Sequence, residues 1–206
     1  LLSQFIENRQ ATLRMFFDWH PWLFLFLVPA VGMRLWSEER RLGTMELLLT
    51  MPISLWHCII GKFLASWIFL TLALVLTFPI WITVTWLGEP DHNVIFTSYL
   101  GSFFLAGAYL SITSMTSAFT RNQVISFILS VVICLFLVLC GYPPVTDNVE
   151  IVAPRYIVEF VAAFSVIPNV EQFNDGQIDS RSIIYFLSVI GFPLFATNII
   201  IRGLRA

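Results

Sequence analysis

Long windows without a charged side chain constrain the fold of this chain most strongly. A helix that crosses the hydrocarbon core of a bilayer needs about 20 consecutive apolar residues. Four such windows are Phe63 to Leu87, Ile95 to Phe119, Val124 to Gly141 and Ser182 to Ile201. Only 12% of the residues are charged, against about 25% in an average soluble domain. The sequence therefore predicts an all-α integral membrane protein.

A fifth and weaker window runs from Trp19 to Trp36. Its 18 residues correspond to about 27 Å of helix, which is enough to cross a bilayer if the helix stands nearly upright. Pro21 lies in the first turn, where proline is tolerated, whereas Pro29 lies mid-helix and predicts a kink. We therefore expect five spanning helices in a single membrane domain that takes up residues 1–206.

The distribution of Lys and Arg predicts the orientation, because cytoplasmic loops retain positive charge. If the charged stretch at Glu38 is cytoplasmic, seven of the 11 basic residues are cytoplasmic too: Arg34, Arg40, Arg41, Lys62, Arg121, Arg202 and Arg205. Five crossings that end inside must begin outside. We therefore expect a further spanning helix upstream of Leu1, which would give six; removal of a signal sequence is the alternative.

The region from Tyr142 to Arg181 is the longest predicted external segment. Its prolines bracket apolar residues at helical spacing, so we expect a short helix from Arg155 to Ile167 that lies in the outer interface or dips into the protein. In this interpretation Pro154 precedes the helix and Pro168 stops it. At about 13 residues such a helix cannot span a bilayer.

Catalytic and metal-binding sites are disfavoured by the sequence. Glu38 and Glu39 would need deep His or Cys partners to form a metal site, but His20, His57 and His92 fall near helix ends or in loops. The pair is more typical of a solvated charge cluster. No catalytic residue, bound cofactor or metal is predicted, and the chain is not expected to be an enzyme by itself.

The chain has no nucleotide-binding loop either. The stretch "IIGK" ends at Lys62, but a phosphate-binding loop needs a glycine where Trp56 stands and a Ser or Thr where Phe63 stands. The full-length spans also lack interior ionisable side chains, which disfavours proton or sodium coupling. Any ATP, with its Mg²⁺, is therefore expected on another polypeptide.

Small and hydroxyl residues crowd the third predicted span, from Ile95 to Phe119. Such residues allow helices to approach closely, so we expect packing rather than the lining of a path. Asn198 is expected to form a hydrogen bond between helices. The three cysteines, Cys58, Cys134 and Cys140, are expected to pack in the interior.

The stretch "EERRLGTMELLLTMP", Glu38 to Pro52, combines the densest charge with a short apolar helix. Thr44 can cap that helix, and Pro52 stops it. Met45, Leu48 and Leu49 repeat at helical spacing, with Glu46 as the helix's charge. The helix is either an anchor in the lipid headgroups or a docking element for a cytoplasmic partner.

These residues resemble the hallmark region of type-2 ABC exporter permeases. "EERRLGTMELLLTMPIS", followed by Gly61 and Lys62, is similar to that region, while "SAFTRNQVISFILS" and "IDSRSIIYFLS" resemble stretches of its gliding-motility subgroup. The resemblance implies a six-helix bundle, with Gly43 to Met51 as a coupling helix in a groove of a separate ATPase. It implies these ATPase-coupling residues: Glu38, Glu39, Arg40, Arg41, Gly43, Thr44, Glu46, Leu48, Leu49 and Pro52. Arg121, Asn122 and Gln123 are expected to form a second cytoplasmic turn, and the short link from Thr120 to Gln123 predicts that its flanking helices form an antiparallel hairpin.

The resemblance implies a permease subunit of an ATP-driven transporter of the exporter type in a bacterial inner membrane. Its partners would be two ABC ATPase subunits, a second permease copy or a homologue, and membrane lipid, with an external or periplasmic protein as a further candidate; no nucleic acid is expected. One alternative is a mechanotransmission complex that moves an external partner and transports nothing. A membrane-embedded enzyme is the third hypothesis. The substrate is not legible from uncharged spans.

Overall fold

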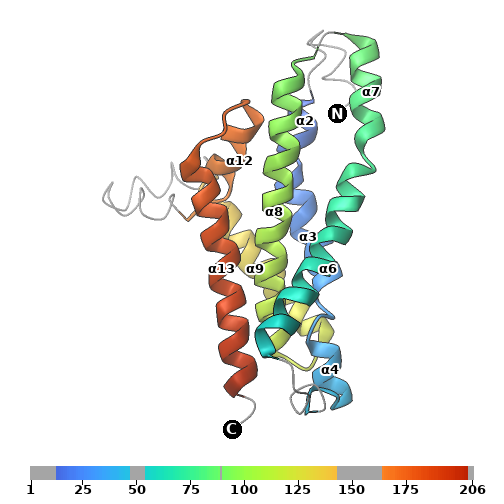
Figure 1. Cartoon of the computed structure of the whole chain (residues 1–206). Coiled ribbons are helices and arrows are strands. Elements are labelled where there is room, and N and C mark those ends of the chain that lie inside the picture. Colours follow the sequence, from blue (N-terminus) through green and yellow to red (C-terminus); the bar gives the residue numbers. More distant parts are fainter. Residues whose placement is uncertain (1–12, 47–53, 89, 143–163, 204–206) are drawn as a thin grey trace, which may run out of the picture. The chain divides into compact units, whose positions relative to one another are not determined.

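The computed structural model describes residues 13–46, 54–88, 90–142 and 164–203, and these residues form helices joined by turns (Figure 1). The helices follow one another along the chain as α2 (Arg14–Asp18), α3 (His20–Gly32), α4 (Ser37–Leu42), α6 (Leu55–Val75), α7 (Phe78–Leu87), α8 (His92–Phe119), α9 (Gln123–Leu139), α12 (Ile167–Asn174) and α13 (Ser180–Gly203). The predicted all-helical membrane fold is confirmed.

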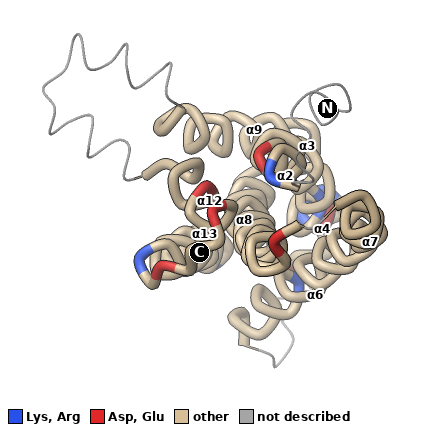
Figure 2. The backbone as a smooth tube through the Cα atoms, turned by 90° about the horizontal axis from the view of Figure 1, so that it is seen from above, with Lys and Arg blue, Asp and Glu red and all other residues tan. Residues whose placement is uncertain are grey.

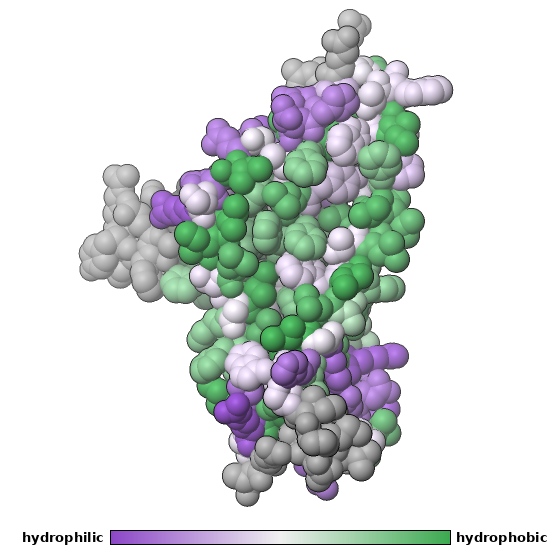
Figure 3. Space-filling view, viewed as in Figure 1, coloured by the Kyte–Doolittle hydropathy of each residue, from purple (hydrophilic) through white to green (hydrophobic). Residues whose placement is uncertain are grey.

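Three stretches are long and apolar enough to cross a bilayer: Leu55–Leu87, His92–Phe119 and Ser180–Gly203. The apolar helix α9 has 17 residues. Large apolar side chains remain exposed along these helices, among them Ile68, Leu76 and Phe192. Figure 3 shows hydrophobic side chains over α13 and over α6 and α7 on the face in view. An exposed apolar surface of this kind is suited to contact with lipid tails.

The second predicted span begins earlier than its charge-free window and is interrupted. α6 begins at Leu55 instead of Phe63 and contains Lys62. A charge limits the part of a helix that can lie in hydrocarbon, but it does not limit the helix itself. α6 ends at Val75, and α7 has Pro79 in its first turn. The ring of Pro79 would clash with the carbonyl of Val75, four residues earlier, so an unbroken helix is unfavourable.

The first predicted span is shorter than expected. α3 ends at Gly32, after 13 residues, and a turn occupies residues 33–36. Pro29 lies inside the helix, as predicted, and it is buried. Because α3 ends at Gly32, Leu35 and Trp36 lie in the turn that precedes α4. This turn positions the candidate functional site described below.

The chain divides into two compact units, and each contains one half of α8. Unit 1 comprises residues 1–23, 71–105 and 137–185, and unit 2 comprises residues 24–70, 106–136 and 186–206. The core of unit 1 includes Phe17 and Ile95, and the core of unit 2 includes Trp36 and Ile59. Charged residues are few along the helices of both units (Figure 2).

The predicted packing role of the small residues in α8 is confirmed. Of the most apolar 18-residue window of α8, 72% is buried, compared with 11% of the corresponding window in Leu55–Leu87. In unit 1, a Cβ atom added at Gly101 would lie 2.7 Å from Cβ of Phe173; in unit 2, one added at Gly107 would lie 2.9 Å from Cε2 of Trp67. The glycines therefore allow close approach by large aromatic side chains.

Two side-chain predictions have different outcomes. Cys134 and Cys140 are buried, and Cys58 packs against the core of unit 2, so all three pack as predicted. Asn198 is also buried, but its Oδ1 atom has no hydrogen-bond partner among the described residues. In the described part of the chain, this oxygen therefore does not accept the hydrogen bond that was predicted to join Asn198 to another helix.

The external segment differs from its prediction where the structure describes it. Most of the helix expected from Arg155 to Ile167 lies outside the described residues. Pro168, predicted as a stop, lies in the first turn of α12. Proline favours that position because the amide it lacks has no partner within the helix there.

Candidate functional site: the turn between α3 and α6

The charged residues of the hallmark stretch form the short helix α4, Ser37–Leu42. Glu38 and Glu39 lie in its first turn, and Arg40 and Arg41 lie in its last turn. This order suits the helix dipole, because the N-terminal end attracts anions and the C-terminal end attracts cations. Gly43 ends the helix with φ of 72°, a left-handed conformation that glycine adopts without steric cost. The sequence therefore sets both the charge order and the end of α4.

A serine of α8 holds the start of α4. Ser117 Oγ accepts hydrogen bonds from the backbone N–H groups of Trp36 and Ser37, each at 3.0 Å, and donates one to the carbonyl of Met33 at 2.9 Å. The first N–H groups of a helix have no partner within the helix. Ser117 thus supplies from another helix the acceptor that a capping side chain normally provides.

The indole of Trp36 strengthens the same contact. Trp36 is fully buried, and its Nε1–H donates to Ser114 Oγ at 3.0 Å. Ser114 and Ser117 are three residues apart, so they lie on one face of α8. Together they bind the backbone and the side chain at the entrance to α4.

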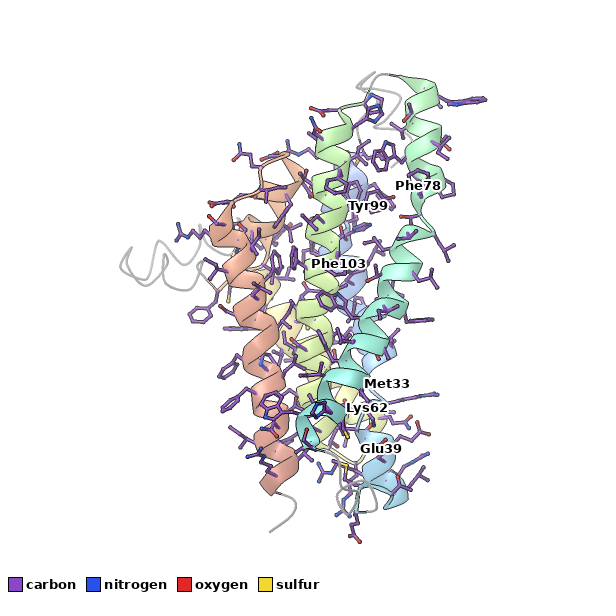
Figure 4. All side chains as sticks on the ribbon, viewed as in Figure 1. Met33, Glu39, Lys62, Phe78, Tyr99 and Phe103 are labelled. Atoms are coloured by element: carbon purple, nitrogen blue, oxygen red, sulfur yellow. The ribbon has the colours of Figure 1, made fainter. Side chains whose placement is uncertain are left out.

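Lys62 joins α6 to the same turn. Its Nζ atom donates to the carbonyl of Leu35 at 2.8 Å, forms a salt bridge with Glu39 Oε1 and lies 4.3 Å from the ring centroid of Trp36. Figure 4 shows Lys62 on α6 and Glu39 on α4. Both charged side chains are less than one third exposed, so the loss of either would leave a poorly solvated charge. Lys62 therefore links α6, which follows residues 47–53, to the turn and to α4, which precede those residues.

Arg40 links α4 to the end of α8. Its Nη1 atom donates to the carbonyl of Ala118 at 2.5 Å. The last carbonyls of a helix lack partners within the helix and carry partial negative charge, so a guanidinium is favourable there. Burial, together with the neighbouring Arg121, lowers the pKa of Arg40 from its ordinary value. Positive charge is thus concentrated where α8 ends.

A cavity of about 290 Å³ in unit 2 brings the two predicted groups of site residues together. Arg41 lines it together with the second turn, Arg121, Asn122 and Gln123. The turn is fixed by its own side chains, because Asn122 Oδ1 accepts from the N–H of Val124 at 2.9 Å and Thr120 Oγ1 accepts from the N–H of Asn122 at 3.1 Å. The short link joins α8 and α9 as the predicted hairpin, and Thr116 and Ser130 are hydrogen bonded across it.

The remaining predicted residues lie around the end of α4. Gly43, Thr44 and Glu46 are exposed, and the hydroxyl of Thr44 is 3.4 Å from the carbonyl of Glu39. Met45 is buried against Trp36 and Ile59 in the core of unit 2. Leu48, Leu49 and Pro52 lie outside the described residues.

Sequence reasoning missed the side chains that hold this site in place. Ser114 and Ser117 belong to a span assigned only to packing, Trp36 only ended a predicted span, and Lys62 was noted only as part of a motif and as one of the cytoplasmic basic residues. The contacts of the two serines join residues about 80 positions apart, and those of Lys62 join residues 23 and 27 positions apart; local periodicity cannot reveal either. Among the described residues, no group of three or more His, Cys, Asp or Glu side chains is placed to hold a metal ion.

Comparison with known proteins supports the resemblance to type-2 ABC permeases, without assigning a subgroup. The model of a family described as "ABC-2 family transporter protein" matches residues 17–173, which include the turn, α6, α8 and α12. No curated protein matches the chain significantly.

Proposed function

Since the chain belongs to the ABC-2 family of transporter membrane proteins and is a permease subunit of an ABC transporter, we propose that its α3–α6 turn couples a separate ATPase to substrate movement. The observation that carries this proposal is the attachment of α4 to two membrane helices. Ser117 and Arg40 attach it to α8, and Glu39 attaches it to Lys62 of α6. A force on residues 43–51 therefore has two routes into the spans.

In this mechanism the segment Gly43 to Met51 docks into the ATPase subunit. ATP and Mg²⁺ bind to the ATPase, and closure of two ATPase copies pushes on the two coupling segments of a permease pair, either two copies of this chain or one copy and a homologue. The salt bridge of Glu39 with Lys62 passes the displacement to α6, and Ser117 passes it to α8. Coupling through rigid-body movement of packed helices is a common form of conformational switching. Export across a bacterial inner membrane is the proposed setting.

The proposal is tested by changing both Leu48 and Leu49 to Asp in the full-length permease, which is co-expressed with its ATPase. Burying an apolar side chain of this size is worth about 1.5–3 kcal/mol, so two buried charges should abolish docking. We expect normal membrane insertion, no co-purification of the ATPase and no substrate movement. The matched variant L48I/L49I keeps the apolar surface and should retain all three. If the ATPase binds and couples with the Asp variant, the segment is a headgroup anchor and the proposal is wrong.

A further inference from the structure

The cavity between Arg41 and the link from α8 to α9 has positive charge that the described residues do not neutralise. Its volume is about 290 Å³, and Arg41 and Arg121 line it without an acidic side chain among the described lining residues. Neither guanidinium forms a salt bridge with a described residue, and Glu39 of α4 is already paired with Lys62. Burial and the charge of Arg121 lower the pKa of Arg40, so like charges are crowded here. A cavity of this kind attracts an anion.

The polar residues of the link add hydrogen-bond donors to the same cavity. Asn122 Oδ1 is occupied by the N–H group of Val124 at 2.9 Å, so the part of this amide left for a ligand is the donor Nδ2. Gln123 also lines the cavity and begins α9, whose N-terminal end carries partial positive charge. Phosphate oxygens form strong hydrogen bonds with arginine. The lining therefore suits a phosphate group.

An exposed apolar stripe on α9 begins at this cavity, because Val124 lines it. Four apolar side chains recur every four residues of α9 and are each more than half exposed: Val124, Ile128, Val132 and Phe136. The residues midway between them are buried: Ser126, Ser130 and Cys134. The 12 steps from Val124 to Phe136 correspond to about 18 Å of helix, and the hydrocarbon of one leaflet is about 15 Å thick. The stripe is therefore long enough to accompany an acyl chain through one leaflet.

We propose that this surface binds one anionic phospholipid, with its phosphate in the cavity between Arg41 and Arg121 and its acyl chains along the stripe of α9. Basic pockets at the cytoplasmic ends of spanning helices are suited to anionic headgroups. An acidic protein segment or a free phosphate would neutralise the arginines but would leave the stripe without a partner, whereas a lipid occupies both.

The bound headgroup would join two parts of unit 2. Arg41 belongs to α4, and Arg121 belongs to the link between α8 and α9. Both arginines and the stripe lie in the same compact unit. The lipid would therefore tie α4 to the start of α9. Its binding does not depend on the proposed coupling to an ATPase.

Binding is tested on the full-length protein without its ATPase, in nanodiscs of phosphatidylglycerol and phosphatidylcholine with identical acyl chains. Native mass spectrometry measures the lipid that the protein retains after transfer to neutral detergent. We expect phosphatidylglycerol to be retained in preference, because it has a net negative charge and phosphatidylcholine has none. R41Q/R121Q should lower the retained phosphatidylglycerol at least about tenfold. The matched control R202Q changes a basic residue of α13 outside the cavity and should retain the lipid as the wild type does.

A second variant tests the stripe and leaves both arginines in place. I128S/V132S makes the exposed face of α9 more polar and should also lower the retention of phosphatidylglycerol. Thermal unfolding in lipid-free neutral detergent checks that each variant is folded. R41Q/R121Q should unfold there near the wild-type temperature, because neither guanidinium has a described salt bridge to lose.

Soluble probes separate the lipid from other anions. Short-chain dihexanoylphosphatidylglycerol should raise the unfolding temperature of the wild type more than inorganic phosphate does at the same concentration. The proposal is overturned if the two nanodisc lipids are retained equally, if R41Q/R121Q retains phosphatidylglycerol as the wild type does, or if phosphate stabilises as much as the short-chain lipid. Stronger stabilisation by an acidic peptide than by the lipid would assign the cavity to a protein partner and would also overturn it.

Discussion

The two compact units use their charged side chains in different ways. Two charged groups of unit 2 join helices: Glu39 is paired with Lys62, and Arg40 is bound to the last turn of α8. In unit 1, Asp18 and Glu171 line a cavity, and the nearby Arg14 is paired with Asp175. Charges that are bound between helices hold those helices in a defined geometry, whereas Asp18 and Glu171 are exposed residues whose carboxylates can be hydrated. Charged contacts therefore fix the turn between α3 and α6 in unit 2, whereas the carboxylates of Asp18 and Glu171 in unit 1 border solvent.

The largest effect is expected from Lys62→Ala. This change removes the partner of Glu39, the donor to Leu35 and the cation over Trp36. Loss of one partner of a buried pair costs about 3–5 kcal/mol, and a half-buried pair should cost about 2–3 kcal/mol. Denaturant unfolding in detergent measures it. The double variant K62M/E39Q leaves no unpaired charge and should be more stable than K62A; the reverse order would contradict the role given to the pair.

Ser117→Ala should have the next largest effect. It removes the acceptor for two N–H groups at the start of α4 and the donor to Met33, at a cost of about 1–2 kcal/mol. Ser114→Ala removes only the bond to the Trp36 indole and serves as the matched control. ATPase stimulation by the permease should fall further in S117A than in S114A. Equal losses would show that Ser117 does not position α4.

Two glycines of unit 2 should respond with opposite signs to substitution by alanine. Gly43 has φ of 72° and no neighbouring atom within 4 Å of an added Cβ, so Gly43→Ala should cost about 1 kcal/mol through the backbone alone. Gly191 has equal space inside helix α13. Gly191→Ala should therefore stabilise the protein by about 0.5–1 kcal/mol. Thermal unfolding of both variants checks this, and a stabilised G43A would refute the left-handed turn.

The smallest effect is a pH-dependent gain in stability from Glu171→Gln. Because the pKa of Glu171 is raised, the folded state holds this proton more tightly than the unfolded state does. Ionised Glu171 therefore destabilises the folded state, and the penalty develops as the pH rises through glutamate's ordinary pKa and past its raised value. At neutral pH the variant should unfold at a slightly higher temperature than the wild type, and the difference should vanish in acid. A lower unfolding temperature at neutral pH would mean that Glu171 has a stabilising partner.

The sequence predicted the features that depend on local chemistry. Charge-free windows located the long helices, and the small residues of α8 correctly indicated close packing. The short link at Asn122 correctly indicated a hairpin. Each of these signals needs only the residues of one segment and their immediate neighbours.

Other features depended on a choice that the local pattern leaves open. Pro168 could stop one helix or start the next, and the structure has it at the start of α12. Lys62 directly precedes the charge-free window that begins at Phe63, but helix α6 begins earlier, at Leu55, and contains Lys62. The break before Pro79 followed from proline chemistry and could have been predicted. The positions of Ser117 and Lys62 beside α4 could not, because they depend on tertiary contacts between distant segments.

The cap that Ser117 gives to α4 has a consequence for biosynthesis. The serine lies 80 residues after the N–H group of Ser37 that it binds, so the nascent chain reaches α4 well before its cap exists. At about 5–20 residues per second, the delay is about 4–16 s. An isolated helix of six residues is too short to be stable in water. The turn between α3 and α6 should therefore mature only after α8 has been inserted.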